Sequence, residues 1–276
     1  MKVLVTGAHG MLGQDLCPIL EDVGAYVIKT DVHSLDITNA EMVNTVIEEE
    51  SPDIVIHCAA YTNVDKAEED IKTATKINVL GSENLAKICG EKDITMVYIS
   101  TDYVFDGKKG SPYTSEDKAN PLNNYGITKF QGEEAVRKYC PKHYIARTAW
   151  LYGIHGKNFV ETMISLADKP ELKVVDDQIG CPTWTVELAN GIVKLIEEED
   201  FGTYHVCGSG NTSWYGFAKE IFTQAGLDVN LKPCTTEEFP RPATRPQVSI
   251  MDNNGICRDW KLALKDYMKL REGILV

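Results

Sequence analysis

The chain has 276 residues, of which 43% are hydrophobic and 25% charged, and its formal net charge is −13. This length predicts one large domain or two closely packed ones, and the acidic balance excludes a general affinity for nucleic acid or anionic membranes. The eight cysteines are scattered without a CxxC pair, and no apolar run approaches a membrane span, so we expect a cytoplasmic protein with reduced thiols and no metal site.

The first predicted element is a strand that ends in a glycine-rich turn. Residues 3–5 are apolar, Gly7, Gly10 and Gly13 follow, and residues 12–20 show helical spacing. A helix N-terminus reached through glycines can bind a pyrophosphate, because its backbone N–H groups point at the anion. We expect Gly7 to form the tight turn, Gly10 to admit the anion and Gly13 to let the helix pack on the sheet.

A second strand, residues 25–28, precedes an acidic residue that bears on cofactor choice. Asp31 lies 24 residues after Gly7, where a carboxylate can accept hydrogen bonds from an adenosine ribose. A carboxylate there repels a 2′-phosphate, which predicts a preference for NADH over NADPH, although Lys29 lies near enough in sequence to soften the repulsion. The structural alternative is an ordinary turn with Asp31 on the surface.

Apolar strands and helical patterns alternate through the first two thirds of the chain. The strands are residues 54–56, 96–99 and 143–147, and helical spacing occurs at 42–47 and 74–89. This alternation predicts an α/β fold with a doubly wound, Rossmann-type parallel sheet covered on both faces. Because ligands bind at the carboxyl ends of such strands, we expect the strand ends at 7–13, 59–62 and 100–102 to converge.

The pattern is looser after residue 147. We predict strands at 173–175 and 204–206, a helix at 186–198, and an ordered loop near a ligand at 233–246, for which a mobile surface loop is the alternative. We expect residues 1–147, with returning segments around 172–207, to form the dinucleotide-binding core. Residues 148–171 and 208–276 are expected to form a smaller substrate-binding part.

Three side chains are candidates for acid–base chemistry. Tyr125 and Lys129 share a helix face, being spaced i, i+4. A lysine charge about 6 Å away, at an effective dielectric of about 20, is worth roughly 3 kcal/mol, which predicts a pKa of Tyr125 lowered by about two units. Thr101, which follows a strand, could hydrogen-bond the substrate oxygen that becomes charged. The alternatives are a helix face with a buried ring and a surface lysine, and a local turn at Thr101.

Together these features resemble the extended short-chain dehydrogenase/reductase family. The residues that carry the resemblance are the GxxGxxG turn, Thr101 and the Tyr-x-x-x-Lys pair, with the segments 60–68, 100–107, 121–129, 147–153, 177–183 and 241–242. The similarity covers nearly the whole chain and is closer to members that act on nucleotide-linked keto sugars. It implies that NADH or NADPH delivers hydride to C4 of dTDP-4-dehydro-β-L-rhamnose.

The resemblance also implies roles for individual residues. Tyr125 would protonate the new alkoxide, and Lys129 would hold the nicotinamide ribose. Thr101, Asp102 and Trp150 would contact the sugar, with core packing as the alternative for Trp150, and Arg241 is the candidate for the substrate's diphosphate. The remaining cofactor contacts would be Gly10, Met11 and Leu12 at the pyrophosphate, Asp31 at the adenosine ribose, Asp36 and Ile37 at the adenine, and Ala60, Tyr61 and Thr62 along the groove.

Two other functions remain open at this stage. One is an epimerase or dehydratase that retains NAD; dehydratases need an additional acid–base pair, and Tyr103, not a glutamate, follows Asp102. The other is a dinucleotide-binding regulatory subunit, which the intact set of Thr101, Tyr125 and Lys129 argues against. Relatives form dimers, which implies a homodimer, whereas scattered carboxylates do not predict an ion such as Mg²⁺ at a dimer contact.

Overall fold

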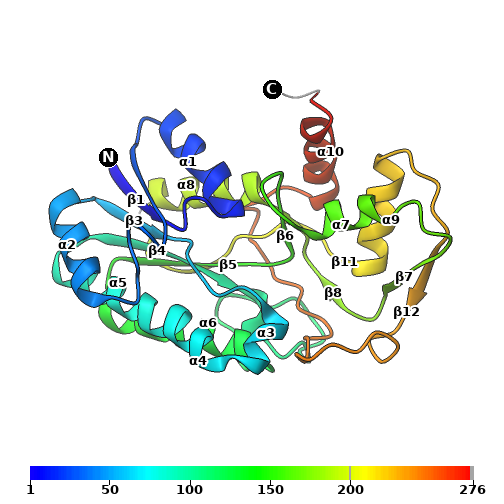
Figure 1. Cartoon of the computed structure of the whole chain (residues 1–276), viewed down its shortest axis with the longest axis horizontal. Helices are drawn as coiled ribbons and strands as arrows, with labels where there is room; N and C mark the ends of the chain where they lie inside the picture. The colour runs from blue at the N-terminus through cyan, green and yellow to red at the C-terminus, as the bar shows by residue number, and fades with distance from the viewer. Residues whose placement is uncertain (199, 274–276) are drawn as a thin grey trace.

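The computed structural model describes residues 1–198 and 200–273. Figure 1 shows two adjoining regions: a sheet flanked by helices, and a smaller group of helices and short strands. The last three residues of the expected substrate-binding part, 274–276, lie outside the described residues. No helix within the described ranges is long and apolar enough to cross a membrane.

A six-stranded parallel sheet forms the larger region, in the order β10-β5-β4-β3-β1-β2. Its strands are β1 (Lys2–Thr6), β2 (Tyr26–Thr30), β3 (Ile54–His57), β4 (Thr95–Thr101), β5 (His143–Thr148) and β10 (Gly202–His205). The strand order reverses between β1 and β3, and a ligand crevice is expected outside the carboxyl ends at such a reversal. The predicted doubly wound parallel sheet is confirmed.

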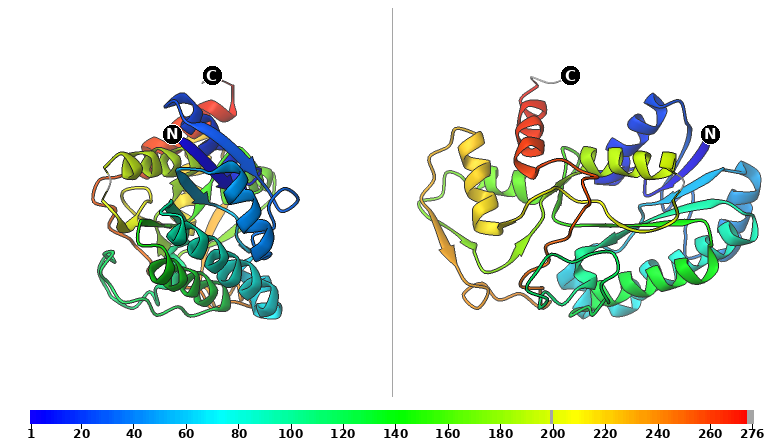
Figure 2. Two further views of the ribbon diagram at one scale, coloured as in Figure 1. Left: turned by 90° about the vertical axis from the view of Figure 1, so that its left-hand side faces the viewer. Right: turned by 180° about the vertical axis from the view of Figure 1, so that it is seen from behind.

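Helices cover both faces of this sheet (Figures 1 and 2). Successive strand residues point to opposite faces, so each strand contributes to two cores. Val3 and Val5 of β1 pack with α1 (Met11–Asp22) and α8 (Thr185–Glu198). Leu4 packs in the opposite core, whose helices are α2 (Ala40–Glu50), α5 (Ser82–Glu91) and α6 (Asn124–Tyr139).

The helix predicted at 74–89 is interrupted by a π-helical turn. It consists of α4 (Ile71–Thr75), η1 (Lys76–Gly81) and α5, and it follows α3 (Val64–Glu69), which was not predicted. The π turn buries Asn78, whose amide accepts from Tyr61 N at 2.8 Å and donates to Tyr61 O at 3.1 Å. The irregular turn therefore holds the backbone of the segment after β3, which was predicted to line the cofactor groove.

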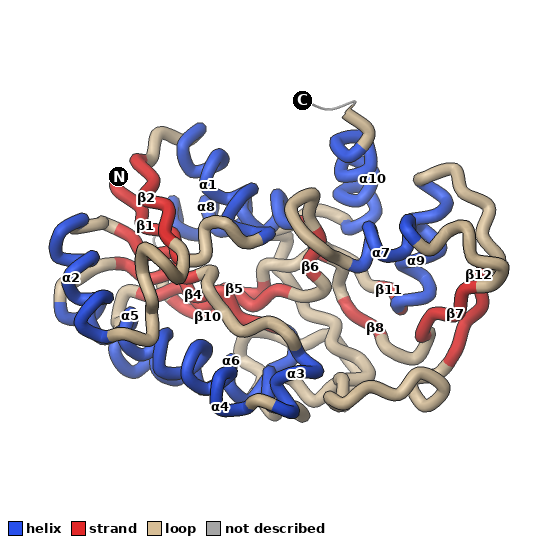
Figure 3. The backbone as a smooth tube through the Cα atoms, viewed as in Figure 1, coloured by secondary structure: helices blue, strands red, loops and turns tan. Residues whose placement is uncertain are grey.

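Short strands and three helices form the smaller region (Figure 3). They are β6 (Leu151–Tyr152), α7 (Phe159–Ser165), β7 (Leu172–Val175), β8 (Ile179–Gly180), β9 (Thr183–Trp184), β11 (Thr212–Ser213), α9 (Trp214–Gln224), β12 (Leu231–Cys234) and α10 (Trp260–Arg271). Within the segment expected to return to the core, α8 and β10 do so, but β7 pairs with β12. Lys173 is exposed between two buried residues of β7. A strand inside a sheet that is covered on both faces would have no solvent-exposed face, so β7 does not suit the main sheet.

A fourth cluster of buried side chains joins the two regions. It contains Val104 and Phe105 after β4, Cys181 between β8 and β9, Cys207 after β10, and Met251 near the C-terminus. Tyr113 forms an isolated bridge with Met251, and Phe105 stacks on Tyr113 with ring centroids 4.1 Å apart. The smaller region is thus packed directly against the carboxyl ends of the sheet strands.

Candidate active site

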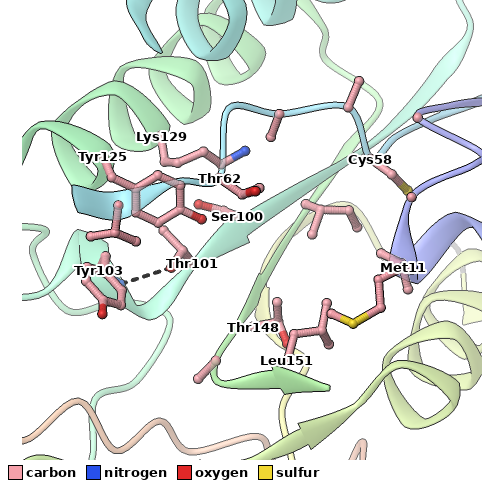
Figure 4. A pocket seen from close by; sticks show the side chains of 18 of the residues that line it. Met11, Cys58, Thr62, Ser100, Thr101, Tyr103, Tyr125, Lys129, Thr148 and Leu151 are labelled. Atoms are coloured by element: carbon pink, nitrogen blue, oxygen red, sulfur yellow. Dashed lines mark hydrogen bonds between the residues drawn. The ribbon is translucent and has the colours of Figure 1, made fainter. Parts of the chain in front are cut away.

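A cavity of about 560 Å³ lies at the carboxyl ends of β1, β3, β4 and β5, between the two regions (Figure 4). It brings together many of the residues singled out from the sequence. Those that line it are Gly7, Gly10, Met11, Leu12, Gly13, Ala60, Thr62, Thr101, Asp102, Tyr125, Lys129 and Trp150.

The glycine turn forms the β1 wall of the cavity. Gly7 has φ +66°, and a Cβ there would lie 2.8 Å from Ala59 N, so both conformation and space require glycine. Gly10 donates its N–H to Gly7 O at 2.9 Å, and it has no side chain to cap the N–H groups that begin α1. A Cβ on Gly13 would lie 2.6 Å from Ala8 Cα, so glycine lets the helix pack directly on the turn.

These features test whether the cavity fits the nicotinamide dinucleotide that the resemblance implies. The uncapped start of α1 offers N–H donors for a pyrophosphate at one end. At the end of β5, among residues 1–198 and 200–273, the buried Thr148 hydroxyl is a lining group without a hydrogen-bond partner. A buried hydroxyl in a cavity wall is ordinarily bonded, so it is available to a ligand. The residues present therefore fit the dinucleotide.

The other residues proposed for the cofactor do not line the cavity. Asp31 directly follows β2; its carboxylate accepts from the backbone of His33 and Ser34 and contacts His9 Nδ1 at 2.9 Å. These hydrogen bonds lower the pKa of Asp31 to about 2. Ile37 is buried in the core, and the carboxylate of Asp36 accepts from Thr38. Tyr61 is held through its backbone, as described above.

Helix α6 carries Tyr125 and Lys129 into the cavity. The side chain of Asn123 accepts from Gly126 N at 2.8 Å and so caps the helix start. Gly126 lets the first turn approach Tyr103, because a Cβ there would lie 2.2 Å from Tyr103 O. The i, i+4 spacing then places Tyr125 and Lys129 on the same face of the helix, as Figure 4 shows.

The pKa of Tyr125 is raised, contrary to the prediction that it is lowered. Desolvation raises the pKa of Tyr125 to about 12; a hydrogen bond with Thr101 lowers it, and the charge of Asp102 raises it again. The Tyr103 ring packs edge to face on Tyr125, with centroids 5.6 Å apart at 76°. The prediction was wrong because it treated the pair in a partly wet medium, whereas burial penalises the phenolate.

Lys129 shows the same effect of burial. Its ammonium lies over the ring of Tyr98, with Nζ 4.1 Å from the ring centroid. The residue is only 3% exposed, and desolvation lowers the pKa of Lys129 to about 7, while the charge of Glu133 opposes the shift. Lys129 therefore loses its proton more readily than an exposed lysine does.

Thr101 and Asp102 are both buried at the end of β4. The Thr101 hydroxyl accepts from Tyr103 N at 3.2 Å and donates to Asp102 Oδ1 at 3.2 Å. Burial raises the pKa of Asp102 to about 6, although hydrogen bonds from Ser249 and Thr101 partly offset the rise. Thr101 therefore takes part in the local turn that was considered as an alternative to a catalytic role. Both Thr101 and Asp102 nevertheless line the cavity.

Trp150 enters the cavity wall through an unusual backbone conformation. Its φ is +46°, a region that non-glycine residues rarely adopt. The indole stacks on Trp214, with ring centroids 3.5 Å apart and planes at 6°, and it lies where a Cβ on Gly180 would clash. Packing in the smaller region therefore stabilises the strained residue at the cavity.

Arg241 lies apart from the cavity-lining set. It is about half exposed, stacks over Phe239 at 4.8 Å, and places Nη1 3.9 Å from Asp65 Oδ2. Arg245, four residues later, forms a bidentate pair with the same carboxylate, with both N–O distances 3.0 Å. The 233–246 loop is thus tied to α3, whose first residue, Val64, lines the cavity.

Several lining residues were missed from the sequence. Thr148 ends β5 as Thr101 ends β4, so the strand-end argument could have found it. Ser100 and Tyr103 flank residues already chosen. Trp214 does not line the cavity itself, and it had no local signal, because its importance comes from stacking on Trp150, 64 positions earlier. Among residues 1–198 and 200–273, no group of three or more His, Cys, Asp or Glu side chains could hold a metal ion.

Comparison with known proteins agrees with this geometry. The model of the RmlD substrate binding domain family matches residues 1–272. The spore coat polysaccharide biosynthesis protein SpsK of Bacillus subtilis is 41% identical, over 98% of each chain. A solved dTDP-4-dehydrorhamnose reductase from Clostridium acetobutylicum is 50% identical, covers 99% of this chain and 100% of its own, and gives a TM-score of 0.96. Another from Bacillus anthracis, in complex with NADP, is 42% identical, covers 97% and 98%, and gives 0.94.

Proposed function

The chain belongs to the RmlD substrate binding domain family, and from that premise we propose that it is a dTDP-4-dehydrorhamnose reductase. It would reduce the 4-keto group of dTDP-4-dehydro-β-L-rhamnose to give dTDP-β-L-rhamnose, a sugar nucleotide for cell-surface polysaccharide. One observation carries the proposal: a tyrosine, a buried lysine and a strand-end threonine line the same cavity as a dinucleotide-type glycine turn.

We propose that the glycine turn and the start of α1 hold the cofactor's pyrophosphate through Gly10, Met11 and Leu12. Asp31 would accept from the adenosine ribose, and Asp36 and the backbone of Ile37 would border the adenine. Ala60, Tyr61 and Thr62 would line the groove, and Lys129 would hold the nicotinamide ribose. When bound, the reduced nicotinamide supplies the hydride.

The protein's own contribution is proton transfer and charge stabilisation. Tyr125 holds its proton at neutral pH, as a general acid must before it donates to an oxygen that gains charge. The Thr101 hydroxyl would donate a hydrogen bond to the same oxygen. The ammonium of Lys129, one helical turn from Tyr125, would favour the phenolate left after the proton has gone.

Substrate recognition would come from both regions. Asp102 and Trp150, which line the cavity, would contact the sugar, and Arg241, which lies 3.9 Å from Asp65 on α3, is the candidate for the diphosphate. We propose residues 1–147 as the dinucleotide-binding core, joined by α8 and β10, and the remainder as the substrate-binding part. The eight cysteines are all free thiols, which favours a reaction in the cytoplasm.

For the cofactor we propose NADH as the preferred reductant, with NADPH also accepted. The Asp31 carboxylate, if it faces the adenosine ribose as proposed, would repel a 2′-phosphate, and its pKa of about 2 keeps it charged at any physiological pH. The contact of His9 with this carboxylate lets a protonated imidazole offset part of that charge. The similar protein from Bacillus anthracis binds NADP, which supports acceptance of the phosphorylated cofactor.

The deciding experiment is an assay of NADH and NADPH oxidation with dTDP-4-dehydrorhamnose and other nucleotide-linked keto sugars. Stoichiometric oxidation with the dTDP sugar is expected. Failure to oxidise either cofactor, together with NAD that stays bound through gel filtration, would instead indicate a cofactor-retaining epimerase or dehydratase. Binding of the dinucleotide without any turnover would indicate a regulatory subunit.

A further inference from the structure

A buried carboxylate lies behind the acid–base pair. The Glu133 side chain, on α6, is fully buried and accepts four hydrogen bonds. Arg147 donates through Nε at 2.9 Å and through Nη2 at 2.7 Å, Arg137 donates through Nη2 at 2.8 Å, and Ser100 Oγ donates at 2.6 Å. Arg147 is 2% exposed, so this is an ion pair in the protein interior.

This carboxylate joins three elements at the base of the cavity. Ser100 on β4 and Arg147 on β5 are register partners, and the next pair in the same register is Thr101 and Thr148. Both threonines line the cavity, as Figure 4 shows. Glu133 therefore fixes the helix that carries Tyr125 to the two strand ends that carry the threonines.

The carboxylate also acts on Lys129 through charge. Tyr125, Lys129 and Glu133 follow one another at intervals of four along α6, so they share a face. Burial lowers the pKa of Lys129, and the Glu133 charge is the largest effect that opposes this. The other titratable or charged groups facing Lys129 or Glu133 are His57 and Cys58 at β3, Tyr98 on β4, Arg137 on α6, Arg147 on β5 and His205 on β10.

Stability alone is a weak reason for such an arrangement. Replacing a buried ion pair with apolar residues of similar volume is often neutral or stabilising, because desolvation of the charges offsets their attraction. Apolar side chains between α6 and the sheet would bind these elements equally well. They would not supply a negative charge one helical turn from the lysine.

We propose that Glu133 is a positioning residue of the reductase: its carboxylate, held by Arg147 and Ser100, keeps Lys129 charged and fixes α6 against the strand end that carries Thr101. The inference rests on the proposed function. It assigns a role to a residue that touches neither cofactor nor substrate, since Glu133 does not line the cavity.

The test compares Glu133→Gln with Glu134→Gln. Glu134 is the next residue on α6. Its carboxylate is more exposed than that of Glu133 and accepts a hydrogen bond from Arg137 Nη1 at 2.7 Å. The readouts are the pH profile of kcat/KM for NADH, which reports groups of the free enzyme, and the ¹⁵N NMR titration of Lys129, assigned by its loss in Lys129→Arg. The NMR titration needs no substrate, so it remains informative if wild-type protein lacks reductase activity and the proposed function fails.

Glu133→Gln should move the alkaline limb of the profile and the Lys129 titration to lower pH by about one unit, and lower kcat at least about tenfold. Glu134→Gln should change neither. Glu133→Asp, which keeps the charge, should retain the wild-type titration of Lys129 and also serves if the glutamine variant does not fold. An unchanged Lys129 titration in Glu133→Gln, or equal shifts in Glu133→Gln and Glu134→Gln, would overturn the proposal.

Discussion

Ser249 donates a 2.6 Å hydrogen bond to the Asp102 carboxylate across 147 positions of the chain. Both residues are buried, Asp102 at the end of β4 and Ser249 in the segment after the 233–246 loop. The bond connects the sheet region to the smaller region inside the cavity wall. The protonation state of Asp102 therefore affects both the stability of the fold and the shape of the proposed sugar site.

Asp102→Asn should alter the pH dependence of stability between pH 4 and 6. The folded protein binds this proton more tightly than the unfolded chain, because burial raises the pKa of Asp102 from 3.8 to about 6. Wild-type protein therefore loses stability as pH rises through this window, by about 3 kcal/mol in total. The variant should lack that loss, which urea unfolding at a series of pH values measures.

Asp106→Asn is the matched control of opposite sign. Hydrogen bonds from Asn120, Lys108 and Tyr113 lower the pKa of Asp106, so its stabilising contribution is lost as pH falls. If the two variants change the stability profile in the same direction, the inferred environment of Asp102 is wrong.

Asp102→Asn should also lower turnover, since Asp102 lines the cavity.

Tyr125→Phe should lower kcat by about 10²–10⁴-fold while the affinity for NADH barely changes. The phenol supplies a proton, whereas the ring and its packing against Tyr103 remain in the phenylalanine variant. Steady-state rates and a fluorescence titration with NADH measure the two effects. Tyr139→Phe, at the far end of the same helix, is the control; unchanged turnover in Tyr125→Phe would remove the proton-transfer role.

Thr101→Val should lower kcat by about 10- to 10³-fold, because valine keeps the shape of threonine but offers no hydroxyl to the substrate oxygen. Thr101→Ser retains the hydroxyl and should stay within severalfold of wild type. Both variants are compared at saturating sugar nucleotide. A serine variant as slow as the valine variant would indicate that the methyl group, through packing, matters more than the hydroxyl.

Arg241→Ala should raise KM for the dTDP sugar far more than KM for the cofactor. The guanidinium is about half exposed, stacks over Phe239 and lies 3.9 Å from the Asp65 carboxylate, so a diphosphate could engage it without displacing a short ion pair. Arg241→Lys should raise KM for the dTDP sugar by a smaller factor, because lysine keeps the positive charge but lacks the planar guanidinium. Equal increases in both KM values would mean that Arg241 is structural.

Asp31→Asn should raise the ratio of kcat/KM for NADPH to that for NADH by about tenfold, because the substitution removes a negative charge opposite the 2′-phosphate. Asp22→Asn, at the exposed end of α1, removes the same charge away from the cofactor and controls for the net charge. No change in the ratio would show that Asp31 does not face the ribose 2′ position.

Local sequence determined much of the fold and part of the site. The glycine turn was predictable because Gly7 needs a positive φ and Gly13 a close approach, and both demands are visible as glycines at fixed spacing. Apolar runs separated by helical patterns predicted the parallel sheet, because the spacing of apolar residues follows from the backbone geometry of strands and helices. The placement of Tyr125 and Lys129 on one face needed only the helix repeat.

The tertiary structure decided the electrostatics and the long-range contacts. The pKa of Tyr125 rises instead of falling because desolvation depends on packing, which the spacing of two residues does not contain. The Ser249–Asp102 bond, the Trp150–Trp214 stack and the Glu133–Arg147 pair join residues that no local pattern relates. Sequence periodicity thus fixes which elements form and which strand ends meet, while the charge state of the side chains there depends on what the folded chain packs around them.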